Sequence, residues 1–171
     1  MVAGEHIFLR ALEPSDVDML YDWENDMDSW FVSNTLVPFS KHTLARYIEA
    51  VEDIHTSRQL RLMICLNSDK QAIGCIDLFD FDPVHQRAGI GILVAQQDAR
   101  GKGYAQEALT ALVGYAWKHL RLHQLYCNIS AENEASLHLF QKQGFQTVGT
   151  KKDWLQGPRG WQDELLLQLI R

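Results

Sequence analysis

The sequence predicts a single α+β domain over residues 1–171, with about seven strands and four helices. Segments with strand-like alternation and segments with helical spacing follow one another in the order β-α-α-β-β-β-α-β-α-β-β. Three consecutive strands are joined by turns too short for a crossover, which predicts an antiparallel meander. A chain of 171 residues can bury one sizeable core, and no repeat or linker-like stretch divides it.

The first third of the chain predicts one strand and two helices. A strand over 6–12 leads into a helix near Pro14, because proline is favoured in a first helical turn. Ser40 is a good N-cap for a second helix over 44–55. The apolar positions at helical spacing, which mark the buried sides, are Leu20, Trp23 and Met27 in the first helix and Leu44, Tyr47, Ile48 and Val51 in the second.

The rest of the chain predicts the meander, two helices and a closing hairpin. Asn133 is a good N-cap for the second of these helices, and Gly144 is a natural stop for it. The expected strands are 59–66, 72–81 and 87–94 in the meander, 122–129 between the two helices, and 146–155 and 161–170 in the hairpin, and the first of these helices covers 103–120.

The most informative segment is Arg-Gly-Lys-Gly-Tyr-Ala at 100–105, between a strand and a long helix. Its glycines allow a ligand to approach the backbone closely. The first amides of the helix are unpaired and carry the positive end of its dipole, and Arg100 and Lys102 add charge. The segment predicts a phosphate or pyrophosphate site, with an ordinary strand-to-helix turn as the alternative. Gln106 and Gln96 stand where a dinucleotide fingerprint and a P-loop need glycine or alanine.

Two segments carry a resemblance to a known family. The pattern Arg-x-x-Gly-x-Ala at 100–105 resembles the pyrophosphate-binding loop of the GNAT family of N-acetyltransferases. Residues 128–145 resemble the family's Asn-x-x-Ser/Ala-x-x-Leu-Tyr-x-x-x-Gly-Phe block, with Phe140 where a tyrosine is usual. Trp30-Phe31 and the closing Gly-x-Arg-Gly-Trp-Gln-Asp are most similar to the bacterial branch with spermidine and ribosomal-protein-alanine N-acetyltransferases.

The resemblance implies a mixed, mostly antiparallel central sheet and transfer of acetyl from acetyl-CoA to a primary amine. It also implies which residues contact the cofactor: the backbone of two strand residues, the loop, and one face of the following block. The residues at the matching positions are Leu93, Val94, Arg100, Gly101, Lys102, Gly103, Tyr104, Ala105, Asn133, Ser136, Phe140 and Lys142. An oxyanion would be held by a backbone amide near Val94.

The catalytic groups are less clear, because two usual residues are absent. An amine is mostly protonated near neutral pH, so a carboxylate must remove a proton, and relatives often carry glutamate where Gly89 stands. Asp77 and Asp80 are the candidate bases, with solvent-facing strand carboxylates as the alternative. Phe140 has no proton for the departing thiolate, so Tyr126 is a candidate acid unless it is a core tyrosine. A silent CoA-binding module is the alternative to an enzyme.

Charge is distributed unevenly and bears on the acceptor. The chain carries a net −6, and residues 1–55 hold eleven acidic and three basic side chains. Asp28, Trp30 and Phe31 are the expected substrate-binding residues, because a carboxylate and aromatic faces hold an ammonium group. The alternative is a solvated acidic surface with both rings in the core. A polyamine, another small amino compound, an aminoglycoside-like amine and a peptide N-terminus stay open as acceptors.

Several classes of partner and location are disfavoured. An acidic chain is not expected to bind nucleic acid, and no apolar run approaches the length of a membrane span. The first residues do not resemble a signal peptide, so we expect a cytoplasmic protein. Cys65, Cys75 and Cys127 lie in apolar strands and read as buried free thiols. No metal-binding motif occurs, so no metal is expected, and a homo-oligomer stays open.

Overall fold

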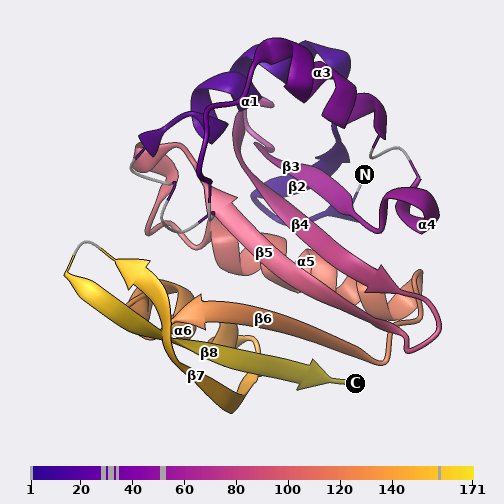
Figure 1. The fold of residues 1–171 in the computed structure, drawn as a ribbon. Helices are drawn as coiled ribbons and strands as arrows, with labels where there is room; N and C mark the ends of the chain where they lie inside the picture. Colours follow the sequence, from indigo (N-terminus) through magenta and orange to yellow (C-terminus); the bar gives the residue numbers. More distant parts are fainter. Residues whose placement is uncertain (1, 28–29, 31–32, 34, 51–52, 158) are drawn as a thin grey trace.

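An eight-stranded sheet forms the centre of the molecule in the computed structural model (Figure 1). The structure describes residues 2–27, 30, 33, 35–50, 53–157 and 159–171. The strands are β1 (Val2–Ala3), β2 (Ile7–Ala11), β3 (Leu60–Leu66), β4 (Ala72–Asp82), β5 (Arg87–Val94), β6 (Gln124–Ser130), β7 (Gln146–Gly157) and β8 (Gly160–Ile170). Their order across the sheet is β1-β2-β3-β4-β5-β6-β8-β7, and only the β5–β6 pair is parallel.

Helices cover both faces of the sheet (Figure 1). A 3₁₀ turn (Pro14–Asp16) leads into α1 (Val17–Glu24), and α1 packs with α3 (Lys41–Ala50) over one face. The long α5 (Tyr104–Lys118) and α6 (Glu134–Lys142) contribute to the larger core on the other face. A single turn, α4 (Ile54–Ser57), follows α3.

The parallel pair in the middle of the sheet opens at one end. β5 and β6 pair at three positions, from Arg87↔Gln124 to Gly89↔Tyr126. Beyond Gly89 the two strands diverge, as Figure 1 shows, so the rest of β5 has β4 as its strand neighbour on one side only. The sheet therefore has a wedge-shaped opening between β5 and the end of β6.

The predicted fold class is confirmed, including the antiparallel meander of β3, β4 and β5. Three details of the prediction were wrong. The sheet has an extra short strand, β1, at its edge. The first helix ends at Glu24, because Asn25 bonds back to the Tyr21 carbonyl and across to Phe39, and Met27 is therefore exposed. The second helix does not continue to residue 55, because Asp53 has an extended backbone and caps a separate turn, and α3 is described as far as Ala50.

The local signals around the other elements were accurate. The Ser40 hydroxyl accepts a bond of 3.1 Å from the Thr43 amide at the start of α3. Gly144 has a φ of 101° just after α6, as expected for a residue that ends a helix. Val51, which was expected on the buried side of the second helix, lies outside the described residues. The three cysteines are buried and unpaired with one another.

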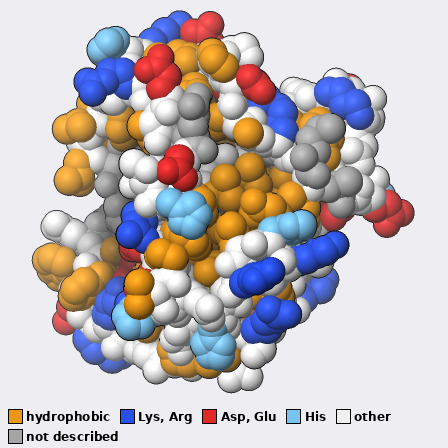
Figure 2. All heavy atoms as spheres, turned by 90° about the vertical axis from the view of Figure 1, so that its right-hand side faces the viewer, with side chains coloured by type: hydrophobic (Ala, Val, Ile, Leu, Met, Phe, Trp, Pro, Cys, Tyr) orange, Lys and Arg blue, Asp and Glu red, His pale blue; other side chains and the backbone are white. Residues whose placement is uncertain are grey.

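Two surface properties complete the description. Among the described residues, no helix is both long and apolar enough to cross a membrane, and the cytoplasmic location stays a prediction. Figure 2 shows the end of the molecule with α4, the β4–β5 turn and the C-terminus, where apolar side chains form a patch bordered by histidine, lysine and arginine.

Candidate functional site

A cleft of about 910 Å³ occupies the opening between β5 and β6. One wall is the diverging part of β5, from Ile90 to Leu93, and the opposite wall is the end of β6 and the first turns of α6. The front of the cleft is polar, since charged side chains from α1, β3, β4 and the β7–β8 hairpin reach it. These are Glu24, Arg61, Asp77, Arg159 and Glu164, and Glu132 joins them from the connection between β6 and α6.

The Gly-rich loop at the head of α5 has the geometry of an anion site. Gly101 and Gly103 have φ angles of 74° and 86°, which non-glycine residues rarely adopt. A Cβ atom built on either glycine would have no other atom within 4 Å, so the space beside this backbone is open. Gly103 is the N-cap of α5 and supplies no side-chain cap, which leaves the first amides of the helix for a ligand. The loop therefore has the open backbone and the free amides that a phosphate or pyrophosphate group needs.

Arg100 has a structural task in this loop. Its Nε donates a bond of 2.8 Å to the Val94 carbonyl, and its Nη2 donates one of 3.4 Å to the Ala95 carbonyl. The guanidinium thus ties the loop to the end of β5. Lys102 is exposed beside it, where its ammonium group can contact a phosphate, whereas Tyr104 packs against the core.

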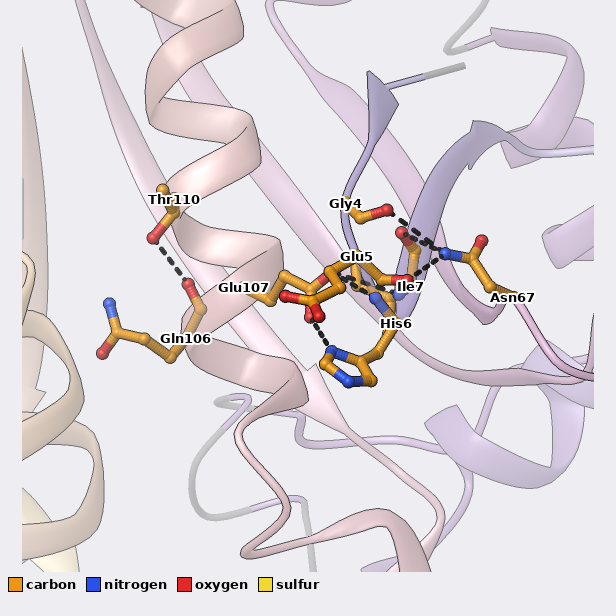
Figure 3. Close-up of polar contacts among 8 residues, drawn as sticks. All are labelled: Gly4, Glu5, His6, Ile7, Asn67, Gln106, Glu107 and Thr110. Atoms are coloured by element: carbon orange, nitrogen blue, oxygen red, sulfur yellow. Dashed lines mark hydrogen bonds and ion pairs between the residues drawn. The ribbon is translucent and has the colours of Figure 1, made fainter.

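The first turn of α5 is anchored from the other side by Glu107 (Figure 3). Its carboxylate accepts bonds from the backbone amides of His6 (2.8 Å) and Ile7 (3.2 Å) and lies 3.2 Å from His6 Nδ1. Partial burial raises the pKa of Glu107, but these bonds outweigh it and lower the pKa overall. Gln106 Nε2 donates to Gln143 Oε1 at 2.7 Å, which links the same turn to the end of α6. The anion site is therefore held by three separate elements.

The second motif lines the wall opposite β5. The Asn133 Oδ1 accepts a bond of 3.1 Å from the Ser136 amide, so Asn133 is the N-cap of α6, and its side-chain amide nitrogen is a donor that this cap does not use. Ser136 and Phe140 also line the cleft, and the Phe140 ring packs edge-to-face against Phe145. Lys142 lies exposed in the last turn of α6 and is not among the residues that line the cleft.

Two carboxylates and one guanidinium form the charged front of the cleft. Arg61 donates from Nε to Asp77 Oδ1 at 2.7 Å, from Nη2 to Asp77 Oδ2 at 3.1 Å, and from Nη1 to Glu24 Oε1 at 2.5 Å. Its guanidinium also lies over the Tyr47 ring, 5.2 Å from the centroid. Burial raises the pKa of Asp77, and the nearby positive charge of Arg61 offsets this only in part. One net negative charge is left at this cluster.

Asp80 and Tyr126 lie elsewhere, so the structure does not bring the three predicted catalytic residues together. Both line a second hollow, beyond the closed end of the cleft. The Tyr126 hydroxyl donates a bond of 3.1 Å to Asp80 Oδ2. Burial, with the nearby charge of Asp80, raises the pKa of Tyr126 to about 12. The catalytic roles of this pair stay predictions.

The expected substrate segment is only partly described. Trp30 Nε1 donates a bond of 2.9 Å to the Glu24 carbonyl, so the half-buried indole is fixed beside the charged cluster. Asp28 and Phe31 lie outside the described residues.

Sequence reasoning missed Glu24, Arg61 and Glu164. Arg61 carried a signal, because it is the one charged residue in the apolar strand β3 and so needed a buried partner. Glu164 is buried and pairs with Lys151 at 2.7 Å, while the Lys151 ammonium also donates to Asn128 and lies over the Trp154 ring. These pairs join residues that are distant in sequence.

The chain is similar to known proteins in both sequence and fold. The sequence pattern of the acetyltransferase (GNAT) domain matches residues 6–146. The chain belongs to this family. It is 26% identical over 149 residues to the spermidine N(1)-acetyltransferase of Vibrio cholerae serotype O1, which covers 85% of this chain and 82% of the relative.

Solved structures agree on the fold. The spermidine N-acetyltransferase of Vibrio cholerae in complex with CoA and spermine superposes with a TM-score of 0.87 at 23% identity, over 96% of this chain and 95% of that chain. A dodecameric structure of the same kind of enzyme from Vibrio cholerae superposes with a TM-score of 0.80 at 25% identity, over 96% and 94%.

Family membership confirms the predicted chemistry at the level of reaction class. The chain is an N-acetyltransferase with acetyl-CoA as its co-substrate. Within the described residues, no three His, Cys, Asp or Glu side chains gather in a way that would hold a metal ion.

Proposed function

We propose that this N-acetyltransferase acts on small cationic amines of the polyamine class. The observation that carries the proposal is the cluster of Glu24, Arg61 and Asp77, where two carboxylates share one guanidinium at the front of the cleft. An incoming ammonium group meets the remaining negative charge in a partly desolvated place, where attraction is stronger than in water. The similarity to enzymes named for spermidine supports the same acceptor class.

Asp77 is the general base in this proposal. Its carboxylate side chain is 24% exposed, so an amine can reach it from the cleft. A carboxylate with a raised pKa accepts a proton more readily than an ordinary aspartate, so burial makes Asp77 a better base. The neutral amine then attacks the thioester carbon, and the nitrogen–carbon bond forms as the carbon–sulfur bond breaks.

The cofactor lies between the loop and the cleft in this proposal. The open backbone at Gly101 and Gly103 receives the pyrophosphate, and Lys102 adds a positive charge. The unpaired edge of β5 at Leu93 and the amide nitrogen of Asn133 hold the pantetheine arm from opposite sides. Phe140 contributes an apolar surface, and water protonates the thiolate, because the pKa of a thiol near ~8.5 makes a thiolate a tolerable leaving group.

Release of free CoA in the presence of a panel of amines tests the proposal. We expect spermidine to be preferred over propylamine, glutamate and a peptide N-terminus. The KM for spermidine should rise with ionic strength, since salt screens the attraction between the acids and the polyamine. A preference for glutamate, or a KM for spermidine that does not change with ionic strength, contradicts a cationic acceptor. No CoA release with any amine, for the wild type and for Phe140→Tyr, favours the silent binding module.

We also propose that the chain forms a homo-oligomer, because a related spermidine N-acetyltransferase is dodecameric. Light scattering at several protein concentrations tests this, and a monomeric mass throughout would contradict it.

A further inference from the structure

A second hollow of about 690 Å³ adjoins the closed end of the cleft. Its lining includes Arg87, Gln124 and Tyr126, which come from the end where β5 and β6 pair. The rest of its wall comes from the end of β4, from β8, from Arg58 before β3 and from Val84 in the β4–β5 turn. The hollow thus lies on the other side of the paired strands from the Gly-rich loop.

A pair of aromatic rings separates this hollow from the cleft. Phe79 lines the cleft, and Tyr126 lines the hollow. The two rings meet edge-to-face, with centroids 5.9 Å apart and an angle of 83° between the planes. An extended molecule that passes this pair would have one end in the cleft and the other in the hollow.

Asp80 differs from the other carboxylates that line the two spaces. Five of these carboxylates have a basic partner: Glu24 and Asp77 with Arg61, Glu132 with Arg159, Glu164 with Lys151, and Asp82 with Arg87. Among the described residues, Asp80 has no such ion pair. Within the part of the chain that the structure describes, its carboxylate accepts a hydrogen bond from the Tyr126 hydroxyl. Asp80 is therefore the carboxylate of the two spaces that forms no ion pair within the described residues, in a hollow that Arg58 and Arg87 also line.

The backbone at Asp80 is unusual as well. Its φ is 49°, in the left-handed region that few non-glycine residues adopt. The register of β4 against β5 shifts between Phe79 and Asp82, so the strand is irregular at this point. Such irregularities re-aim side chains and occur next to binding sites. The carboxylate is directed toward Tyr126 at a cost in backbone strain.

We propose that Asp80 and Tyr126 form the binding site for the distal ammonium group of a diamine or polyamine acceptor. This inference rests on the proposed function, with the reacting amine at Asp77. The two aspartates lie three positions apart on β4, which corresponds to about 10 Å along a strand. A short monoamine reaches only Asp77, whereas an elongated acceptor reaches both carboxylates.

The charged residues around Asp80 determine which end group of an acceptor the hollow can bind. Asp82 is paired with Arg87 at 3.4 Å, and Arg58 donates from Nη1 to the Phe81 carbonyl. Both arginines line the hollow, so a carboxylate on the acceptor would be attracted there too. Cadaverine and lysine are therefore the discriminating pair, because they share the reacting amine and chain and differ by one carboxylate.

The test compares Asp80→Asn with the wild type for spermidine, cadaverine, lysine and propylamine. We expect kcat/KM for spermidine and cadaverine to fall about tenfold or more, since a charged hydrogen bond is lost. The value for propylamine should change less than twofold. Tyr126→Phe should cause a smaller loss for the same two acceptors. Asp69→Asn is the matched control. Asp69 is an exposed acid in the turn before β4, whereas Asp80 lies near the other end of that strand, and substitution of Asp69 should leave kcat/KM unchanged for all four amines.

Four outcomes overturn the inference. An unchanged kcat/KM for spermidine in Asp80→Asn would show that Asp80 does not bind the distal ammonium group, and it would not contradict the proposed function. An equal loss for propylamine and spermidine places Asp80 at the reacting amine instead. A wild-type preference for lysine over cadaverine assigns the hollow to a carboxylate. If the wild type neither acetylates spermidine nor binds it in calorimetry with CoA present, the proposed function itself fails, and the inference fails with it.

Discussion

The ring of Phe79 fills the space that a side chain at Gly89 would need. The two residues pair across β4 and β5, and a Cβ atom added to Gly89 would collide with three atoms of the ring. Phe79 is held in turn by its contact with Tyr126. This chain therefore has an aromatic ring at the place where many relatives are expected to carry a glutamate.

A glutamate at position 89 tests whether the Phe79 ring excludes a side chain there. Gly89→Glu should lower the free energy of unfolding by about 1–3 kcal/mol, because the new side chain overpacks the site. The double variant Gly89→Glu with Phe79→Ala should lose less stability than the two single variants added together, since the ring that the new side chain meets is then absent. Denaturant unfolding of the three variants measures the difference. Equal stability of wild type and Gly89→Glu would show that the ring moves aside freely.

The raised pKa of Asp77 predicts a pH dependence. A base must be ionised, and a higher pKa means that the ionised form is lost at a higher pH than for an ordinary aspartate. kcat/KM should therefore fall as the pH is lowered through this raised pKa. Asp77→Asn should lower kcat/KM by about 10²–10⁴ and abolish this acidic limb.

Glu24→Gln is the matched control for Asp77. It removes the other partner of Arg61 and leaves the base in place. We expect a higher KM, an unchanged kcat, and a kcat/KM that still falls as the pH is lowered. A similar loss of kcat in both variants would indicate that the cluster acts only by holding the cleft together.

Gly103 allows the anion site to be tested apart from backbone strain. Gly103→Asn and Gly103→Ala both place a side chain in the open space beside the loop, but asparagine tolerates a positive φ better than alanine. We expect both variants to lose affinity for CoA in calorimetry, because the space itself is needed. Gly114→Ala, at an open position in the middle of α5, should bind CoA normally. Normal binding by Gly103→Asn would mean that only the backbone conformation matters.

The accuracy of the sequence predictions follows the range of the interactions. The Gly-rich loop, the Ser40 and Asn133 caps and the Gly144 stop depend on neighbours within a few residues, and they are where the sequence indicated. The end of α1 depends on bonds from Asn25 to Phe39, fourteen residues away, and it was misplaced.

The charged front of the cleft shows the same limit. Arg61 joins Glu24, thirty-seven residues away, to Asp77, sixteen residues away, and only the folded sheet makes them neighbours. The candidates Asp77 and Asp80 were chosen because both lie on one strand before the loop. The irregular register near Asp80 separates them into two spaces, and no local pattern in the sequence announces it.

Asn133 has two tasks that substitutions can separate. Its Oδ1 caps α6 by accepting from the Ser136 amide, and its amide nitrogen faces the cofactor in our proposal. Asn133→Asp keeps an acceptor for the cap and removes the donor. It should leave the free energy of unfolding close to that of the wild type while the KM for acetyl-CoA rises. Asn133→Ala removes both groups and should also cost about 1 kcal/mol of stability. Unfolding curves and acetyl-CoA kinetics on the two variants distinguish the tasks: if Asn133→Asp binds acetyl-CoA as well as the wild type, Asn133 is a helix cap and nothing more.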